Sequence, residues 1–225
     1  MRKLRTACQA IACLLLYVGA AVSAQAAVIE GTVLPPPPRQ QNVVVNPYPG
    51  RAHTTATHAE DAAHSARWSD IVVFLRGDGL PRRSTKGATH QLAQQDKTFV
   101  PRVLPIEVGD EVEFPNFDPF YHNVFSYSPV KRFDLGKYAE GRSSSIVFPD
   151  PGEVRIFCDI HSEMNAVILV MENGFFTQPD ETGHFRIENV PPGNYQLVLW
   201  HPDRSEQVRN VEVSSTGLHD MALSF

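Results

Sequence analysis

The sequence predicts an all-β fold of the β-sandwich type. After residue 26, no segment shows a sustained 3.6-residue apolar period, whereas short alternating runs recur between Gly, Pro, Asn and Asp. Turn chemistry separates these runs, as in Val-Gly-Asp at 108–110, Asp-Pro-Gly at 150–152 and Pro-Pro-Gly at 191–193. The predicted strands are 28–34, 70–76, 89–94, 103–108, 111–115, 123–126, 144–148, 152–158, 166–171, 184–187, 193–200, 207–213 and 220–225.

Residues 1–26 have the pattern of a secretory signal peptide. A basic start precedes an apolar run from about Ala10 to Val22, and a small-residue cleavage motif follows. Cleavage after Ala26 fits this motif, and cleavage after Ala24 is the alternative. The run is shorter than the roughly 20 residues of a spanning helix. We therefore expect a periplasmic protein with no membrane span in its mature form; an uncleaved anchor is the alternative.

Residues 35–67 are expected to form a long mobile loop. The stretch begins with four prolines, which favour an extended conformation, and continues with little apolar surface to bury. Its histidines, His53, His58 and His64, are interpreted as solvated, with capture of a metal as the alternative.

Charge and cysteine content narrow the function. Removal of residues 1–26 takes three basic residues away and leaves 17 basic against 25 acidic residues, a net charge of −8. This balance argues against nucleic acid and anionic membranes as partners. Cys8 and Cys13 also leave, so Cys158 has no partner for an intramolecular disulfide. Such a cysteine indicates a reactive thiol, an intermolecular bridge or a metal ligand, with a structural buried cysteine as the alternative.

A short segment near residue 160 concentrates metal-binding side chains. Cys158, His161 and Met164 lie within seven positions, and His122 precedes them in Tyr-His-Asn-Val. A thiolate, two imidazoles and a weak thioether are the ligand set of a blue-copper electron-transfer site. We therefore predict one type 1 copper bound by these four residues, with Met164 as the axial ligand. Glu163 is the alternative axial ligand, and a packing role is the alternative for His122 and Met164.

Residues 89–171 resemble the cupredoxins, in the plastocyanin and amicyanin group. The resemblance rests on the segments that begin at Phe99, Val112, His122 and Gly152, and the Cys-x2-His-x2-Met spacing is similar to that of amicyanin. It implies a Greek-key β-sandwich over residues 85–172.

The resemblance also implies roles around the copper. Asn123 would support the thiolate through its backbone, as the residue after the first histidine does in that family. An unidentified redox protein would dock near His161. In this chain Asp159 and Glu163 make that face more acidic, which favours a basic partner.

The remaining strands resemble a carboxypeptidase regulatory-like, or prealbumin-like, sandwich. Residues 183–197 follow its pattern Gly-x-Phe-x-Ile-x-x-Val-Pro-x-Gly-x-Tyr-x-Leu, and its first strands are similar to 29–33 and 71–75. We therefore predict a smaller, discontinuous sandwich of residues 27–80 and 173–225 with the cupredoxin inserted. In the alternative linear order, residues 28–76 belong to the cupredoxin.

The sequence thus predicts a periplasmic carrier of single electrons. The whole chain looks similar to proteins of the methylamine-utilisation or plastocyanin-like type, which combine these two modules. We expect no enzymatic activity, because a second histidine set and a nucleophile with a base and an orienting acid are lacking; His184, His201 and His219 receive no ligand role. The alternatives are a copper carrier or sensor without electron transfer, and a structural or interaction protein.

Overall fold

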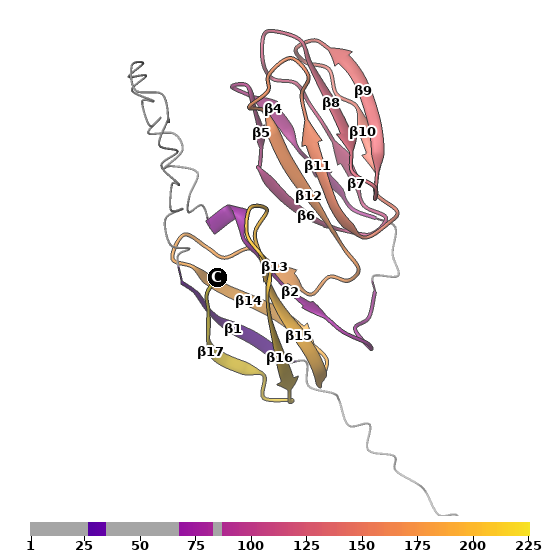
Figure 1. The fold of residues 1–225 in the computed structure, drawn as a ribbon. Coiled ribbons are helices and arrows are strands. Elements are labelled where there is room, and N and C mark those ends of the chain that lie inside the picture. The colour runs from indigo at the N-terminus through magenta and orange to yellow at the C-terminus, as the bar shows by residue number, and fades with distance from the viewer. Residues whose placement is uncertain (1–26, 35–67, 83–86) are drawn as a thin grey trace, which may run out of the picture.

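A computed structural model describes residues 27–34, 68–82 and 87–225 of the chain (Figure 1). These residues form strands and one short 3-10 helix, η1 (Trp68–Asp70), and they contain no α-helix. The predicted all-β fold is confirmed. The strands are β1 (Ala27–Val33), β2 (Val72–Arg76), β3 (Thr89–Gln91), β4 (Ala93–Gln95), β5 (Thr98–Val100), β6 (Val103–Glu107), β7 (Glu111–Glu113), β8 (His122–Tyr127), β9 (Arg132–Tyr138), β10 (Ser145–Val147), β11 (Gly152–Phe157), β12 (Asn165–Met171), β13 (Phe176–Thr177), β14 (His184–Val190), β15 (Gly193–Trp200), β16 (Gln207–Val213) and β17 (Leu218–Leu223).

The strands form two groups, one above the other in Figure 1. The upper group contains the sheets β6-β12-β11-β8-β9 and β10-β7-β3 and the hairpin β4-β5. The lower group contains the sheets β14-β1-β17 and β13-β2-β15-β16. Among the described strands, no sheet mixes members of the two groups.

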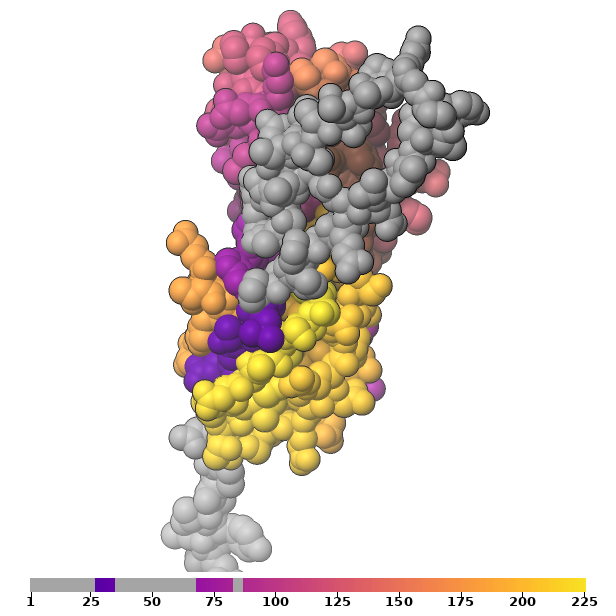
Figure 2. Space-filling model, turned by 60° about the vertical axis from the view of Figure 1, so that its left-hand side comes forward, coloured from indigo at the N-terminus to yellow at the C-terminus, as the bar shows by residue number. Residues whose placement is uncertain are grey.

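Strand β1 joins the two ends of the chain in one sheet. It pairs antiparallel with β14 and parallel with β17, and Figure 2 shows it in indigo between the orange and yellow strands. Strand β2 likewise pairs with β15 and β13. The strands before and after the upper group therefore share their sheets. That the two groups fold as autonomous domains stays a prediction.

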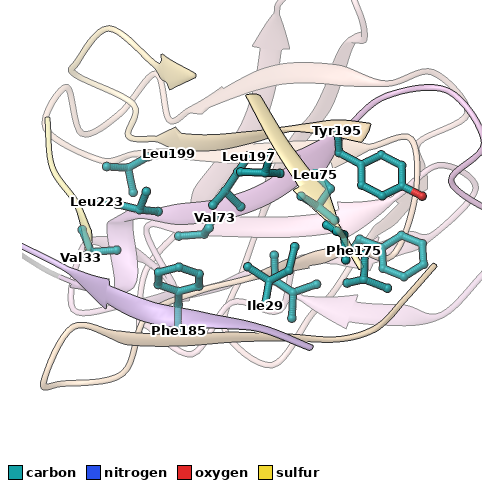
Figure 3. Close-up of a cluster of buried hydrophobic side chains, with 14 of the residues drawn as sticks. Ile29, Val33, Val73, Leu75, Phe175, Phe185, Tyr195, Leu197, Leu199 and Leu223 are labelled. Carbon is teal, nitrogen blue, oxygen red and sulfur yellow. The ribbon is translucent and has the colours of Figure 1, made fainter. Parts of the chain in front are cut away.

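Three apolar layers hold the sheets together. The lower sandwich has a core of large side chains from both of its sheets (Figure 3), and the upper sandwich has a second core between its sheets. A third layer lies between the groups, where β6 and β12 face β2 and β15. Its buried residues are Val72, Phe74, Val103, Val167, Leu169, Met171, Val198 and Trp200.

This layering explains why two strands, β2 and β12, are apolar at all but one terminal residue. In β12, alternate residues such as Ile168 and Val170 enter the upper core, whereas Val167, Leu169 and Met171 enter the layer between the groups. Strand β2 divides its side chains in the same way between the lower core and that layer. A strand that is covered on both faces loses the polar alternation of a half-exposed strand.

An ion-pair cluster borders the layer between the groups. Arg102, just before β6, lies 2.7 Å from the carboxylate of Asp70 in η1 and 2.8 Å from that of Asp203, which follows β15. Its pKa is raised, because the two carboxylates outweigh the effect of its burial. Arg155 in β11 donates to the carbonyl oxygen of Pro202 at 3.1 Å. Polar contacts therefore connect the same two groups as the apolar layer.

Three strands were not predicted, and their sequences show why. Strand β5 has three residues, and the hairpin that leads to it turns at Asp96-Lys97 instead of a Gly-containing pair. Strand β13 has two residues. Strand β9 does alternate between half-buried and exposed side chains, but its Gly136 and its charged residues hide the pattern.

Candidate metal centre

The candidate metal centre lies at one end of the upper sandwich, where β8 begins and β11 ends. His122 is the first residue of β8, and Cys158 follows the last residue of β11. The two strands are antiparallel neighbours, paired at Phe125 and Phe157. Antiparallel pairing brings the start of one strand next to the end of the other, so residues 36 positions apart meet.

The loop from β11 to β12 folds back on itself and adds His161. Its backbone closes through a bond from the N–H of Met164 to the carbonyl of His161, at 3.0 Å, and one from the N–H of Cys158 to the carbonyl of Met164, at 3.3 Å. This turn points His161 back towards His122.

Three of the four predicted ligands converge on one point. Nδ1 of His122 lies 3.1 Å from Nδ1 of His161, and Sγ of Cys158 lies 3.8 Å from the former and 4.0 Å from the latter. Within the described residues this is the one group of three or more His, Cys, Asp or Glu side chains whose ligand atoms come this close together.

The distances fit a bound metal ion. With bonds of about 2.0–2.1 Å to nitrogen and about 2.3 Å to sulfur, as in zinc sites, a trigonal plane places the nitrogens about 3.5 Å apart and each about 3.8 Å from the sulfur. The donor atoms of this chain already lie near these separations. Two imidazoles and a thiolate suit copper or zinc.

Asp118 orients His122 for this role. Its Oδ2 lies 2.7 Å from Nε2 of His122, so Nε2 carries the proton and Nδ1 keeps its lone pair for a metal. Burial alone would raise the pKa of Asp118, but the N–H groups of Lys97 and Asp96 and the ring of His122 lower it below its usual value. The carboxylate is thus held in its charged form.

Asn123 ties the two strand ends together. Its side-chain oxygen accepts the backbone N–H of Asp159, the residue after Cys158, at 2.8 Å. The bond runs through the side chain, whereas the resemblance placed the support in the backbone. Asn123 therefore fixes the turn that carries the thiol, and its part in metal binding stays a prediction.

Met164 faces the buried side of the loop. Its side chain is 1% exposed and packs in the same core cluster as Cys158. Glu163 is exposed and lies next to the hydroxyl of Ser162. The packing therefore favours Met164 over Glu163 as the neighbour of the thiol, while its axial role stays a prediction.

The exposed ring of Phe120 packs against both histidines of the centre. The ring of Phe120 lies 5.2 Å from that of His122 and 5.7 Å from that of His161, between centroids. Phe117, Tyr121 and Ile160 are each at least 42% exposed. His161 is half-buried, and its pKa is lowered by burial and by the charges of His122 and Lys97.

Two lysines partly neutralise the acidic charge expected on the surface around His161. Asp159 lies 3.5 Å from the ammonium of Lys137. Lys97 places its ammonium 5.5 Å from the centroid of Phe120. The identity and charge of a redox partner stay a prediction.

The remaining histidines lie away from the centre. His201 is buried near Asp203, His219 contacts Glu30, and His184 begins β14. His53, His58 and His64 lie outside the described residues, as do the proposed signal peptide and the loop 35–67. None of the helices within the described ranges is long and apolar enough to cross a membrane.

Sequence reasoning missed Asp118, Phe120 and Lys97. A carboxylate four residues before a ligand histidine was an available signal, because ligand histidines commonly donate their second N–H to a carboxylate. Phe120 and Lys97 had no such signal, because only the folded chain brings Lys97 next to the loop before β8.

Comparisons with known proteins find partial similarities. The family model for polysaccharide lyase family 4, domain II, matches residues 165–220. This range begins within the predicted cupredoxin domain and includes residues 183–197, whose resemblance to a carboxypeptidase regulatory-like pattern stays a prediction. No curated protein gives a significant match.

Similar solved structures match less than half of the chain. A purple cupredoxin from Nitrosopumilus maritimus is 21% identical with a TM-score of 0.34, over 36% of this chain and 99% of that one. Amicyanin from Paracoccus versutus is 16% identical with a TM-score of 0.35, over 44% and 97%. A copper-containing nitrite reductase from Thermus scotoductus SA-01 is 28% identical with a TM-score of 0.36, over 44% of this chain and 26% of that one.

Proposed function

We propose that the chain is a periplasmic copper protein that carries single electrons between redox partners. The observation that supports this is the convergence of Nδ1 of His122, Nδ1 of His161 and Sγ of Cys158, with their ligand atoms within 4.8 Å of one another. Together with a buried methionine beside the thiol, this donor set is that of a blue-copper site.

Each residue has a defined part in this proposal. Cys158 would supply the thiolate, His122 and His161 would supply neutral imidazole nitrogens, and Met164 would supply a weak thioether sulfur. Copper bound there supplies a one-electron redox couple. Asp118 and Asn123 keep two ligands in place from outside the donor set.

The burial of the ligands supports electron transfer. The side chains of His122, Cys158 and Met164 are at most 5% exposed, so water is kept from that side of the centre. Of the four predicted ligands, only His161 reaches the surface, next to the exposed ring of Phe120. A redox protein docking at this histidine would come close to the ligands. In this proposal the protein is exported through residues 1–26. It catalyses no reaction and has no nucleic-acid partner.

The experiment that tests the proposal is a visible absorption titration of the mature protein with Cu(II). We expect an intense thiolate-to-copper band that saturates at one equivalent. Cys158→Ala should abolish the band, because it removes the thiolate, whereas His219→Ala, at an exposed histidine outside the centre, should keep it. Absence of the band in folded, reduced protein would contradict the proposal and favour an interaction role.

The axial ligand is tested by the reduction potential. Met164→Gln should retain copper and shift the potential, because the axial group tunes it. Glu163→Gln, one residue earlier and exposed, is the matched variant. A shift in Glu163→Gln with none in Met164→Gln would assign the axial position to Glu163.

A further inference from the structure

The hairpin β4-β5 reaches the candidate metal centre through its tip. The tip residues Asp96 and Lys97 both have left-handed backbone angles, with φ of 54° and 58°. Side chains other than glycine rarely adopt this conformation without support from their surroundings. The tip is therefore a place where the surrounding structure holds the backbone.

Asp118 provides that support. Its Oδ1 accepts the backbone N–H of Asp96 at 2.7 Å, and its Oδ2 accepts that of Lys97 at 2.9 Å. The same Oδ2 contacts Nε2 of His122. Asp118 is 4% exposed, so one buried carboxylate connects the hairpin tip to a metal-ligand candidate.

From the anchored tip, the side chain of Lys97 extends to the ring of Phe120. Its ammonium lies 5.5 Å from the centroid of Phe120, whose ring packs against those of both His122 and His161. Within the described parts of the chain, Lys97 forms no ion pair with a carboxylate side chain. Its ammonium thus lies at the ring that packs against both histidines, while the buried carboxylate of Asp118 is bonded to the backbone of the same tip.

From this geometry we propose that the fixed charge of Lys97 biases the centre towards its reduced form. A positive charge near a redox site favours the form that carries less positive charge, which is the reduced one. Asp118 keeps the charge in place by holding the tip. The inference rests on the proposed function, since it concerns the same centre.

The test measures the reduction potential of the copper-loaded full chain by spectroelectrochemistry. In Lys97→Gln, the equilibrium constant for reduction by a fixed mediator should fall by a factor of about two to five at low salt, the range of exposed charge interactions. Lys97→Glu should lower this equilibrium constant further, and Lys97→Arg should keep the wild-type value because it keeps the positive charge. The differences should shrink at high ionic strength.

Lys131 offers a matched control. It lies between β8 and β9, at the end of β8 opposite His122, so Lys131→Gln removes the same charge far from the centre. We expect its potential to equal that of the wild type. Equal potentials for Lys97→Gln and Lys131→Gln would overturn the inference.

Two further readouts separate this inference from the proposed function. The absorption spectrum is recorded before any potential is measured. If the copper band is missing in the wild type and in every variant, the proposed function itself is overturned. In the metal-free full chain, slow amide hydrogen exchange at Asp96 and Lys97 is expected from their bonds to Asp118. Fast exchange at both amides would overturn the anchoring of the tip.

Discussion

Asp118 is the side chain on which the organisation of the centre depends most directly. It accepts hydrogen bonds from two backbone amides and from a ring nitrogen of His122, and it is buried. An asparagine of the same shape offers one oxygen in place of two and no negative charge. His122 would then lose the partner that fixes its tautomer.

Asp118→Asn is therefore expected to weaken Cu(II) binding by a factor of about 10 to 100, the usual effect of losing a carboxylate behind a ligand histidine. Competition with a chelator of known affinity measures the change. Asp150→Asn removes an exposed carboxylate from the turn before β11 and should bind copper like the wild type. Equal affinities for the two variants would show that Asp118 does not orient His122.

At the scale of an element, the turn between β6 and β7 shows how one carboxylate supports a strand connection. Asp110 is almost fully buried, and its Oδ1 accepts the N–H of Ala88 at 2.7 Å. Its Oδ2 accepts the N–H of Glu107 at 3.0 Å and lies 2.7 Å from Nε2 of His90. Gly109 has a φ of 90°, which a glycine adopts without strain. The turn therefore joins β3, β6 and β7.

These contacts predict a specific acid dependence of stability. Burial would raise the pKa of Asp110, but the bonds from Glu107, His90 and Ala88 lower it below the usual 3.8. A carboxylate with a lowered pKa in the folded state stabilises the fold above its unfolded pKa and loses that contribution as the pH falls through its folded pKa.

Asp110→Asn should accordingly reduce the slope of unfolding free energy against pH below about pH 4. Urea unfolding at a series of acidic pH values measures it. Asp150→Asn, with an exposed carboxylate, should keep the wild-type slope. An unchanged slope in Asp110→Asn would show that other groups control acid unfolding.

The prediction of strands from the sequence was wrong where a strand depends on tertiary contacts and has no clear local pattern. Strands with strong alternation or strong turns, such as β11 and β15, lie within one residue of the predicted ranges. Strand β5 is short and exists through its pairing with β4, and its tip is held by Asp118 from another part of the chain. Such support is invisible in a local window of sequence.

For the whole molecule, the junction between the strand groups depends on Arg102. Its partner Asp70 is 1% exposed, and among the described residues the other carboxylate oxygen of Asp70 has no hydrogen-bond partner. Removal of Arg102 would leave a buried charge without compensation. Breaking a buried pair in this way usually costs several kcal/mol.

Arg102→Met should lower the free energy of unfolding by about 3 kcal/mol. Arg82→Met is the matched control, because its pair with Glu172 is exposed on both sides and should contribute about 1 kcal/mol or less. Chemical denaturation measures both. Similar losses in the two variants would mean that solvent compensates Asp70 at the junction.

Limited proteolysis tests the predicted domain division. We expect a resistant fragment close to residues 85–172, and after its separation in moderate urea the pieces 27–80 and 173–225 should remain in one complex. The reason is that β1 and β2 pair with β14, β15 and β17. Recovery of residues 27–80 with the 85–172 fragment instead would support the linear order.

The sequence by itself determined the all-β class and most strand positions, because alternation and turn residues act locally. It also singled out Cys158, His161 and His122, because metal-binding residue types are rare and their spacing in a short loop is informative. Only the tertiary structure brought His122 to Cys158, since strand pairing between β8 and β11 joins residues distant in the chain. It alone revealed Asp118 and Lys97 at the centre and the apolar layer between the groups, because these depend on which faces and loops meet after folding.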